Sequence, residues 1–453
     1  MRIAILPLGR PTFDVDYARE KLDAVLAQLD SSEHEIIGSR ELLLDGEATL
    51  TAIRDAADAN PDRLLILQIT FTDAAMTVEA ARNVDSPMAI WAVPEPRTGG
   101  RLRLNAFCGL NLASHALGLN HRRFGWAYAE GGAADLDALL DETCWVAPIA
   151  APTAPKAEGR SPLEGRRIAR IGAHPDGFDT CAYDDDALSG LAGVKVDALE
   201  LDDLFSRAKE QPAHEVAALD ETARYAIGGM DDVDAGELDK SLRLKLALDS
   251  LREENGYDAF AIRCWPETFT EYGGAVCGPV SLLGEARVPC ACEADVYGAV
   301  TQLLLQKVAE APVFLTDIVD MDEADDTGVV WHCGQAPLSM AAEETPPSAT
   351  IHTNRKMPLL AQFALKPGRV TFVRISQAFG ETSMVLASGE MLERPMAYTG
   401  TSGVVRFDKP ITDVLPSMIG CGLEHHMALA YGDHADALEA AAKTLGLGVT
   451  RLA

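Results

Sequence analysis

Carboxylates stand directly after three short apolar runs of the chain, and they are the side chains best placed for chemistry. The run "AFAIRC" leads to Trp265 and Glu267, "RVPCAC" leads to Glu293, and "APVFL" leads to Asp317. If these runs are strands of open α/β sheets, their polar successors gather beyond the carboxyl ends of the strands, where such sheets bind ligands. Carboxylates in that position suit a divalent cation or acid–base catalysis.

A histidine doublet late in the chain offers the imidazole that a metal site would need. His425 and His426 lie in "GLEHHMALAYGD", residues 422–433, and the whole chain has only 10 histidines. One imidazole with Glu293 and Asp317 would suit Mn²⁺ and leave coordination positions for substrate oxygens. The three segments are far apart in the sequence, so only the fold could unite them. A first-turn acid of the next helix remains the alternative for Glu293, and a solvated loop acid for Asp317.

The elements that must position these residues alternate in a regular way. Continuous apolar runs separated by amphipathic helices indicate parallel sheets covered on both faces, first in the N-terminal third and again after a Pro- and Ala-rich linker at 149–165. Later runs such as "GRVTFVRIS" and "SGVVRFD" are typical of antiparallel strands. We therefore predict an α/β protein with two doubly wound, Rossmann-like domains and a C-terminal domain rich in antiparallel strands. The predicted boundaries are 1–155, 166–311 and 312–453.

Composition limits the classes of partner. Among 453 residues, 69 are acidic and 39 basic, and the resulting net charge of −30 disfavours nucleic acid and anionic membranes. The N-terminal "MRIAILPLGRPTFD" lacks the pattern of a signal sequence, and no apolar run approaches the length of a bilayer span, so we expect a cytoplasmic protein. The 9 cysteines show no CxxC pair, and we expect reduced thiols. A zinc site seeded by Cys290 and Cys292 is the less favoured alternative.

Three segments carry a family resemblance. "CEADVYGAVTQLLLQ", then "PVFLTDI" and much later "HHMALAYGDHADALEAAAKTLGLGV" together resemble the L-fucose isomerase and L-arabinose isomerase superfamily. The resemblance implies aldose–ketose isomerisation of a pentose, deoxy or sulfonated sugar through a cis-enediol. It also implies Mn²⁺, with Mg²⁺ or Co²⁺ as alternatives, held by Glu293, Asp317 and His426, and it gives the two carboxylates the roles of base and acid. The arabinose-isomerase branch adds His332 as a candidate fourth ligand or substrate contact.

Further residues are candidates for the wall of the sugar pocket. They are Trp265, Glu267, Trp331, Gln335, His425 and Asn105, the last in the segment "NAFCGLN", which we expect to be a loop. In the resembled enzymes the N-terminal domain of one subunit often completes a neighbour's site, which implies a homo-oligomer, either a trimer or a hexamer.

A lyase or epimerase using the same enediolate is an alternative function, and a sugar-binding protein without catalysis is another.

Overall fold

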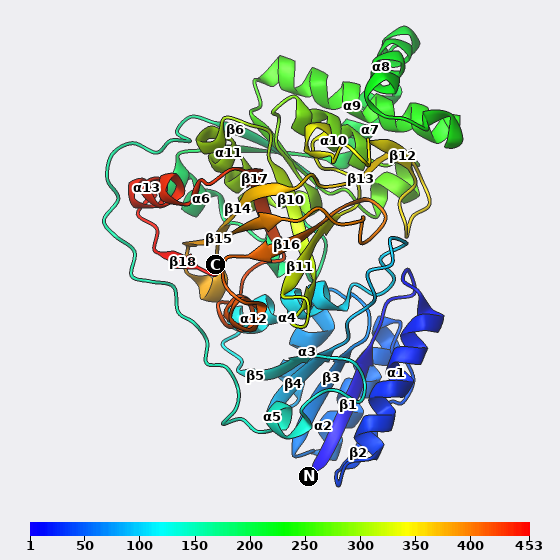
Figure 1. Ribbon diagram of the computed structural model, residues 1–453, viewed down its shortest axis with the longest axis vertical. Coiled ribbons are helices and arrows are strands. Elements are labelled where there is room, and N and C mark those ends of the chain that lie inside the picture. The colour runs from blue at the N-terminus through cyan, green and yellow to red at the C-terminus, as the bar shows by residue number, and fades with distance from the viewer.

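The N-terminal part of the protein is a parallel α/β layer (Figure 1). In the computed structural model, which describes residues 1–453, its five strands follow the order β2-β1-β3-β4-β5. The strands are β1 (Arg2–Leu8), β2 (Glu35–Gly38), β3 (Arg63–Gln68), β4 (Met88–Ala92) and β5 (Phe124–Tyr128). The helices are α1 (Val15–Asp30), α2 (Gly46–Ala59), α3 (Ala75–Asn83), α4 (Ala106–Leu119) and α5 (Leu136–Leu140). Strand β4 is buried along its whole length, because helices cover both faces of the sheet.

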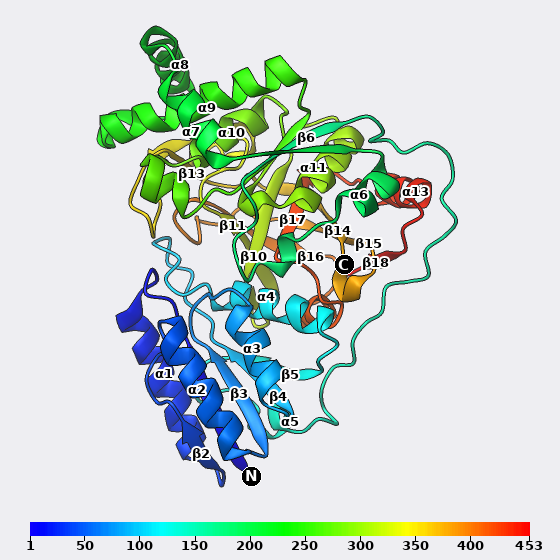
Figure 2. The same cartoon turned by 180° about the vertical axis from the view of Figure 1, so that it is seen from behind.

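The central part repeats the parallel architecture on a smaller scale. Its four strands, in the order β7-β6-β8-β9, are β6 (Arg167–Ile171), β7 (Lys195–Leu199), β8 (Ala259–Ile262) and β9 (Cys290–Ala291). The helices are α6 (Asp185–Ala192), α7 (Leu201–Lys209), α8 (Ala213–Ala226), α9 (Ala235–Asn255), α10 (Cys277–Glu285) and α11 (Val296–Ala309). Helices α8 and α9 project from the end of the molecule opposite the N-terminal domain (Figure 2). No helix in the chain combines the length and apolar character needed to cross a bilayer.

The C-terminal part is a nine-stranded sheet that closes on itself. The strands are β10 (Phe314–Asp322), β11 (Thr327–His332), β12 (Ser348–Thr350), β13 (Leu360–Ala364), β14 (Gly368–Ser376), β15 (Ser383–Met391), β16 (Thr401–Phe407), β17 (His426–Tyr431) and β18 (Val449–Arg451). Six of them run β16-β11-β10-β17-β14-β15, and an additional β15–β16 pairing joins the two ends. Every pairing in this six-stranded ring is antiparallel, which confirms the predicted fold class. Helices α12 (Ile411–Gly420) and α13 (Ala435–Leu445) flank the ring.

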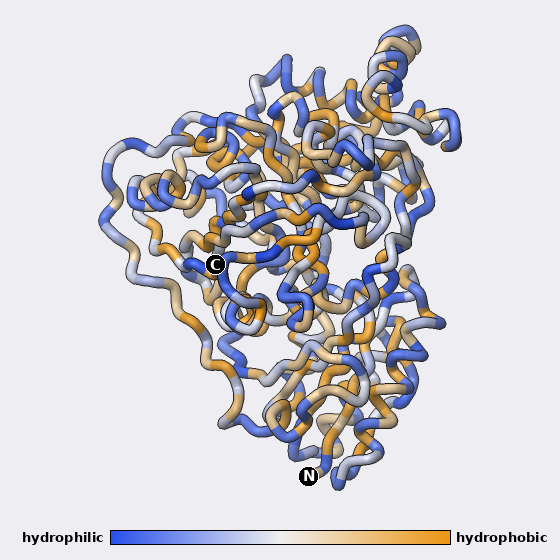
Figure 3. Tube along the Cα trace, viewed as in Figure 1, coloured by the Kyte–Doolittle hydropathy of each residue, from blue (hydrophilic) through white to orange (hydrophobic).

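One continuous apolar core joins the N-terminal sheet to the C-terminal ring. It includes strands β1, β3 and β4 together with residues of β10, β14 and β17. Figure 3 shows the same distribution, with apolar residues along the inner strands and polar residues on the outer turns. Helix α4 belongs to this core and is buried from Ala106 to Gly118, so the expectation that "NAFCGLN" is a loop was wrong. Apolar residues on every side of this helix explain its burial.

Two buried carboxylates fix the N-terminal domain near the site, and one of them also ties it to the C-terminal ring. Glu95 accepts from the backbone amides of Arg103, Leu104 and Asn105 at 2.6, 2.7 and 2.8 Å, and so holds the start of α4. Asp320, beyond a bulge in β10, accepts from Arg97 and from the Tyr128 hydroxyl, both at 2.6 Å. The C-terminal ring is thus anchored to the N-terminal domain close to the strand that carries Asp317.

Candidate active site

Glu293 occupies the predicted corner between a strand and a helix. It follows β9, adopts a left-handed backbone with φ of 59° and is only 9% exposed. Such a backbone is costly for a residue other than glycine and persists only where packing enforces it. The Trp265 indole nitrogen donates to Oε1 of Glu293 at 3.0 Å, and Nε2 of His425 lies 2.8 Å from Oε2. The Glu293 side chain is therefore held from two sides.

The neighbours of Glu293 keep it ionised. Burial raises the pKa of Glu293, but the hydrogen bond and charge of His425, the charge of His426 and the Trp265 hydrogen bond outweigh that effect and lower it to about 2. A carboxyl group with so low a pKa is an anion at neutral pH. Glu293 can therefore act as a proton acceptor or as a metal ligand without first losing a proton.

Asp317 and His426 come together through strand pairing. They stand directly opposite each other on the antiparallel strands β10 and β17. Nε2 of His426 lies 3.5 Å from Oδ1 of Asp317 and 3.8 Å from Oε2 of Glu293. The three residues singled out from the sequence as metal ligands thus converge at one point in the structure.

Asp317 is the least satisfied member of this group. Its Oδ1 atom is buried and has no hydrogen-bond partner. Burial, with the charge of Glu293 as a second cause, raises the pKa of Asp317 well above its usual range. A divalent cation between Asp317, Glu293 and His426 would satisfy the orphaned oxygen and offset the repulsion of the two carboxylates. Two oxygens and one imidazole nitrogen are ligands that Mn²⁺ accepts, so the residues present fit the ion.

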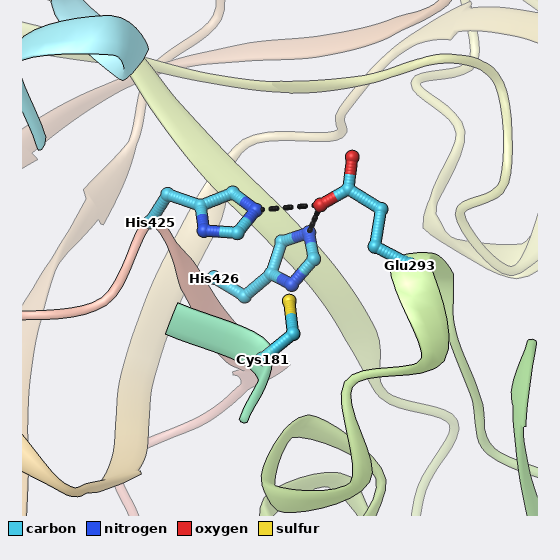
Figure 4. Close-up of side chains that lie close together, drawn as sticks. All are labelled: Cys181, Glu293, His425 and His426. Carbon is cyan, nitrogen blue, oxygen red and sulfur yellow. Dashed lines mark hydrogen bonds and ion pairs between the residues drawn. The ribbon is translucent and has the colours of Figure 1, made fainter. Parts of the chain in front are cut away.

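The two histidines of the doublet differ in how they are held. Figure 4 shows both imidazoles directed at the same oxygen of Glu293, with the sulfur of Cys181 beyond the His426 ring. Nδ1 of His426 is 2.9 Å from Oδ2 of Asp295, which leaves its Nε2 atom facing the other carboxylates. A carboxylate behind a ligating imidazole is the usual arrangement in metal sites. Nδ1 of His425 is buried and has no partner, so geometry favours His426 as the ligand.

Behind His426 lies a buried charge network that the sequence analysis missed. Arg374 and Asp295 are both fully buried, and Nη1 and Nη2 of Arg374 donate to the two oxygens of Asp295 at 2.5 and 3.1 Å. Asp295 also caps helix α11 by accepting from the amide of Gly298 at 2.7 Å. The one signal in the sequence was the acid directly before the helix in "EAD", which also describes an ordinary N-cap.

His332 lies beside the candidate metal ligands. Its ring is 5.6 Å from that of His426 at 25°, and donor atoms of His332, Asp317 and His426 lie within 4.8 Å of one another. This position is compatible with a fourth ligand. The side-chain amide of Gln335 lies against both ring nitrogens of His332, at 2.9 Å from Nε2, so it would have to move for Nε2 to bind a metal.

The predicted pocket residues divide into two groups. Asn105, Trp265, Trp331 and His425 line the same pocket as Glu293, Asp317 and His332, and Oδ1 of Asn105 is buried without a partner. Glu267 does not line this pocket, because its Oε2 pairs with Nε of Arg263 at 2.7 Å. Gln335 is also outside the wall, since it packs behind His332. Glu267 and Gln335 were predicted because they are close in sequence to other site residues, but the sequence does not show in which direction their side chains point.

The pocket is shared by distant parts of one chain. Seven of its residues come from the N-terminal domain: Arg10, Thr12, Phe13, Phe71, Leu102, Asn105 and Cys108. The family resemblance suggested that a neighbouring subunit would supply such residues, whereas here the chain's own domain lies against its site. The homo-oligomer stays a prediction, and it does not depend on the N-terminal residues that line this pocket.

One pair of cysteines contradicts the expectation of nine reduced thiols. Cys264 and Cys292 form a disulfide, with Cα atoms 5.8 Å apart. The two residues follow the parallel strands β8 and β9, whose pairing brings their side chains together. They directly precede Trp265 and Glu293, so the bond joins the backbone beneath two residues of the pocket. Seven cysteines remain free, as expected.

Comparisons with known proteins bear on the whole chain. Residues 4–146 match the model for the fucose/sulfoquinovose isomerase N-terminal domain, and 330–452 match that for the L-fucose isomerase C-terminal domain. A sulfoquinovose isomerase from Clostridium sp. (strain MSTE9) is 31% identical over 98% of both chains. Another from Alkalicoccus urumqiensis is 29% identical over 96% of this chain and 95% of its own. A third from Priestia aryabhattai is 29% identical over 95% and 94%.

Proposed function

Because this chain belongs to the fucose isomerase-like family, we propose that it is a metal-dependent aldose–ketose isomerase acting on a sulfonated monosaccharide. The observation that carries the proposal is the convergence of Glu293 and Asp317, which line the pocket, with His426, whose Nε2 lies within 3.8 Å of both carboxylates. The names of the relatives, each a sulfoquinovose isomerase, favour a sulfonated sugar among the substrates that the sequence left open.

The reaction requires a proton to leave one carbon and another to arrive at its neighbour. Starting from the aldose, the ionised carboxylate of Glu293 takes the proton from carbon 2, which leads to a cis-enediol. Asp317 delivers a proton to carbon 1, and the hydroxyl proton of the carbon 2 oxygen is transferred to the carbon 1 oxygen as the ketone forms, so the atoms balance. In the metal-free protein the environments of the two carboxyls shift their pKa values in opposite directions, which supports the assignment of one as base and the other as acid.

The ligand set has a defined role for each residue. Mn²⁺ held by Glu293, Asp317 and His426 would polarise the substrate carbonyl as a Lewis acid. Asp295 holds His426 in the orientation that leaves its Nε2 free. Trp265, Trp331 and the phenylalanines of the pocket exclude water around the reacting carbons.

Isotope exchange tests the mechanism. We would incubate the protein with sulfoquinovose, fucose and arabinose in D₂O, with Mn²⁺, Mg²⁺ or Co²⁺ and separately with a chelator. Metal-dependent interconversion with deuterium at the carbon beside the carbonyl is the expected result. Interconversion without exchange would point to a hydride shift, and inversion or cleavage without a ketose product would point to the epimerase or lyase.

The two histidines provide a matched pair of variants for metal binding. His426→Ala should lose bound metal and activity together, whereas His425→Ala should keep the metal. Metal content measured on purified protein gives the answer independently of turnover. Full metal content in His426→Ala would refute the ligand assignment. The trimer or hexamer that we also propose can be tested by light scattering on the same samples.

A further inference from the structure

Two guanidinium groups stand at the pocket close to a residue that contacts Glu293. Cζ of Arg10 is 5.5 Å and Cζ of Arg355 is 5.6 Å from the centre of a Trp265 ring. The same indole donates its N–H to Glu293. Arg10 follows β1 in the N-terminal domain, and Arg355 lies in the segment between β12 and β13, so the two charges come from different domains.

The two arginines differ in their partners. Arg10 forms an ion pair with Asp73. Arg355 is half-buried, and neither a carboxylate nor another acceptor contacts its guanidinium. In a chain with 69 acidic and 39 basic residues, a half-buried arginine would readily find a carboxylate, so its free state requires an explanation. Burial, and secondly the charge of Arg10, lower the pKa of Arg355, which means that both effects oppose its positive charge.

The segment that carries Arg355 is fixed rather than loose. Arg101 donates through Nη2 to Oδ1 of Asn354 at 2.9 Å and to the carbonyl of Thr12 at 2.7 Å. The ring of His352 packs edge-on against Phe269 at 5.1 Å. The segment of Arg355 is therefore held at the pocket by contacts to the N-terminal and central domains. The guanidinium group of Arg355 remains available to a ligand in the pocket.

An anion is the ligand that this arrangement fits. A net charge of −30 and the carboxylates of the pocket repel an anionic sugar, so a substrate of that kind needs local cations to bind. A guanidinium group binds two oxygens of a sulfonate or phosphate at once through parallel N–H donors. Among these anions the names of the relatives favour the sulfonate.

We propose that Arg355, supported by Arg10, binds the sulfonate of the substrate and selects sulfonated sugars over neutral ones. The proposal rests on the isomerase function, because it assigns the far end of the same substrate. With the reacting carbons at Glu293 and Asp317, the sulfonate end of the sugar would extend to the part of the same pocket where Arg10 and Arg355 lie near the Trp265 indole. Arg355 is then a specificity-determining residue that takes no part in proton transfer.

The test compares a charged substrate with a neutral one. Arg355→Gln should lower kcat/KM for sulfoquinovose by roughly 10- to 100-fold, the usual loss for a hydrogen bond to a charged group. The same variant should change kcat/KM for glucose, which lacks the sulfonate, by less than about threefold. Arg355→Lys should recover only part of the loss, because a point charge cannot bind two oxygens in parallel. Arg406→Gln, an exposed residue with the same loss of charge, serves as the control and should match the wild type.

A binding measurement separates failure of this proposal from failure of the isomerase function. Methyl sulfoquinovoside cannot open to an aldehyde, so calorimetry reports its binding without any turnover. Binding by the wild type that Arg355→Gln loses would support the sulfonate site even if no isomerisation occurs. Equal loss for sulfoquinovose and glucose, or unchanged binding of the glycoside, would overturn the proposal. Glucose 6-phosphate bound more tightly than sulfoquinovose would overturn the choice of sulfonate over phosphate.

Discussion

Replacing Asp295 with asparagine should destabilise the protein and loosen its metal site together. The carboxylate of Asp295 receives two donors from Arg374 at 2.5 and 3.1 Å and one from the Gly298 amide at 2.7 Å, and it lies 2.9 Å from Nδ1 of His426. Arg374 is fully buried, so removing its partner leaves an uncompensated charge, which costs about 3–5 kcal/mol. Glu424, 3.8 Å from Nε of Arg374, offsets part of this cost. We therefore expect a loss of about 3 kcal/mol in the free energy of unfolding.

Urea unfolding at neutral pH measures this loss, and metal titration gives a second, independent result. Without the carboxylate that orients His426, metal affinity should fall roughly 10- to 100-fold. Asp234→Asn is a matched control, because Asp234 is an exposed N-cap of α9, and the same change there should cost less than about 0.5 kcal/mol.

A double variant separates the two effects of the carboxylate. Replacing Asp295 with Leu and Arg374 with Met removes both charges, so stability should recover toward that of the wild type while metal affinity stays low. If Asp295→Asn unfolded within about 1 kcal/mol of the wild type, the buried charge pair would not have the structural role argued here.

Three further changes have defined outcomes. In the metal-free protein the pKa of Asp317 is raised above its value of 3.8 in the unfolded chain, because the folded state holds the proton more tightly. The free energy of unfolding therefore falls as the pH rises from 3.8 through the pKa of Asp317 in the folded state. The urea midpoint of metal-free Asp317→Asn should thus vary less with pH than that of the wild type between about pH 5 and about pH 8, and it should be the higher of the two at about pH 8. A variant less stable than the wild type at about pH 8 would contradict the reasoning. Glu95→Gln places an amide group against three backbone N–H donors and should lower the free energy of unfolding in urea by about 2–3 kcal/mol. An unchanged free energy would indicate that water takes over the hydrogen bonds of the carboxylate. Tyr128→Phe removes the hydroxyl that donates to Asp320 and should lower the free energy of unfolding in urea by about 1–2 kcal/mol; an unchanged free energy would show that Arg97 alone suffices.

The sequence predicted the parts of the fold that depend on local pattern. Continuous apolar runs such as those of β3 and β4 indicated parallel strands, because burial on both faces leaves no polar positions. The ring closure was not predictable in the same way, since the pairing of β15 with β16 depends on the position of the whole sheet. The same limit applies to register, which alone decides that Asp317 faces His426.

The site was predicted where the residue type was distinctive and missed where it was ordinary. Glu293 follows a strand, His426 begins one, and Asp317 lies within β10 instead of beyond a strand end as expected; all three match a family pattern, whereas Asp295 has the sequence signature of any N-cap. Arg374 sits in a strand with no polar neighbour to mark it, and Arg355 lies in a polar segment where an arginine attracts no notice. Their roles follow from what surrounds them in space, which a single sequence does not contain.

The closed ring would also govern when the protein could acquire the metal that we propose. Asp317 lies on the first strand of the ring to be synthesised, and His426 begins the last, β17. Four other ring strands emerge from the ribosome between them, so a partly made chain holds at most the two carboxylates. An ion bound by all three groups can only enter after β17 has inserted between β10 and β14, and metal acquisition therefore follows folding of the C-terminal domain.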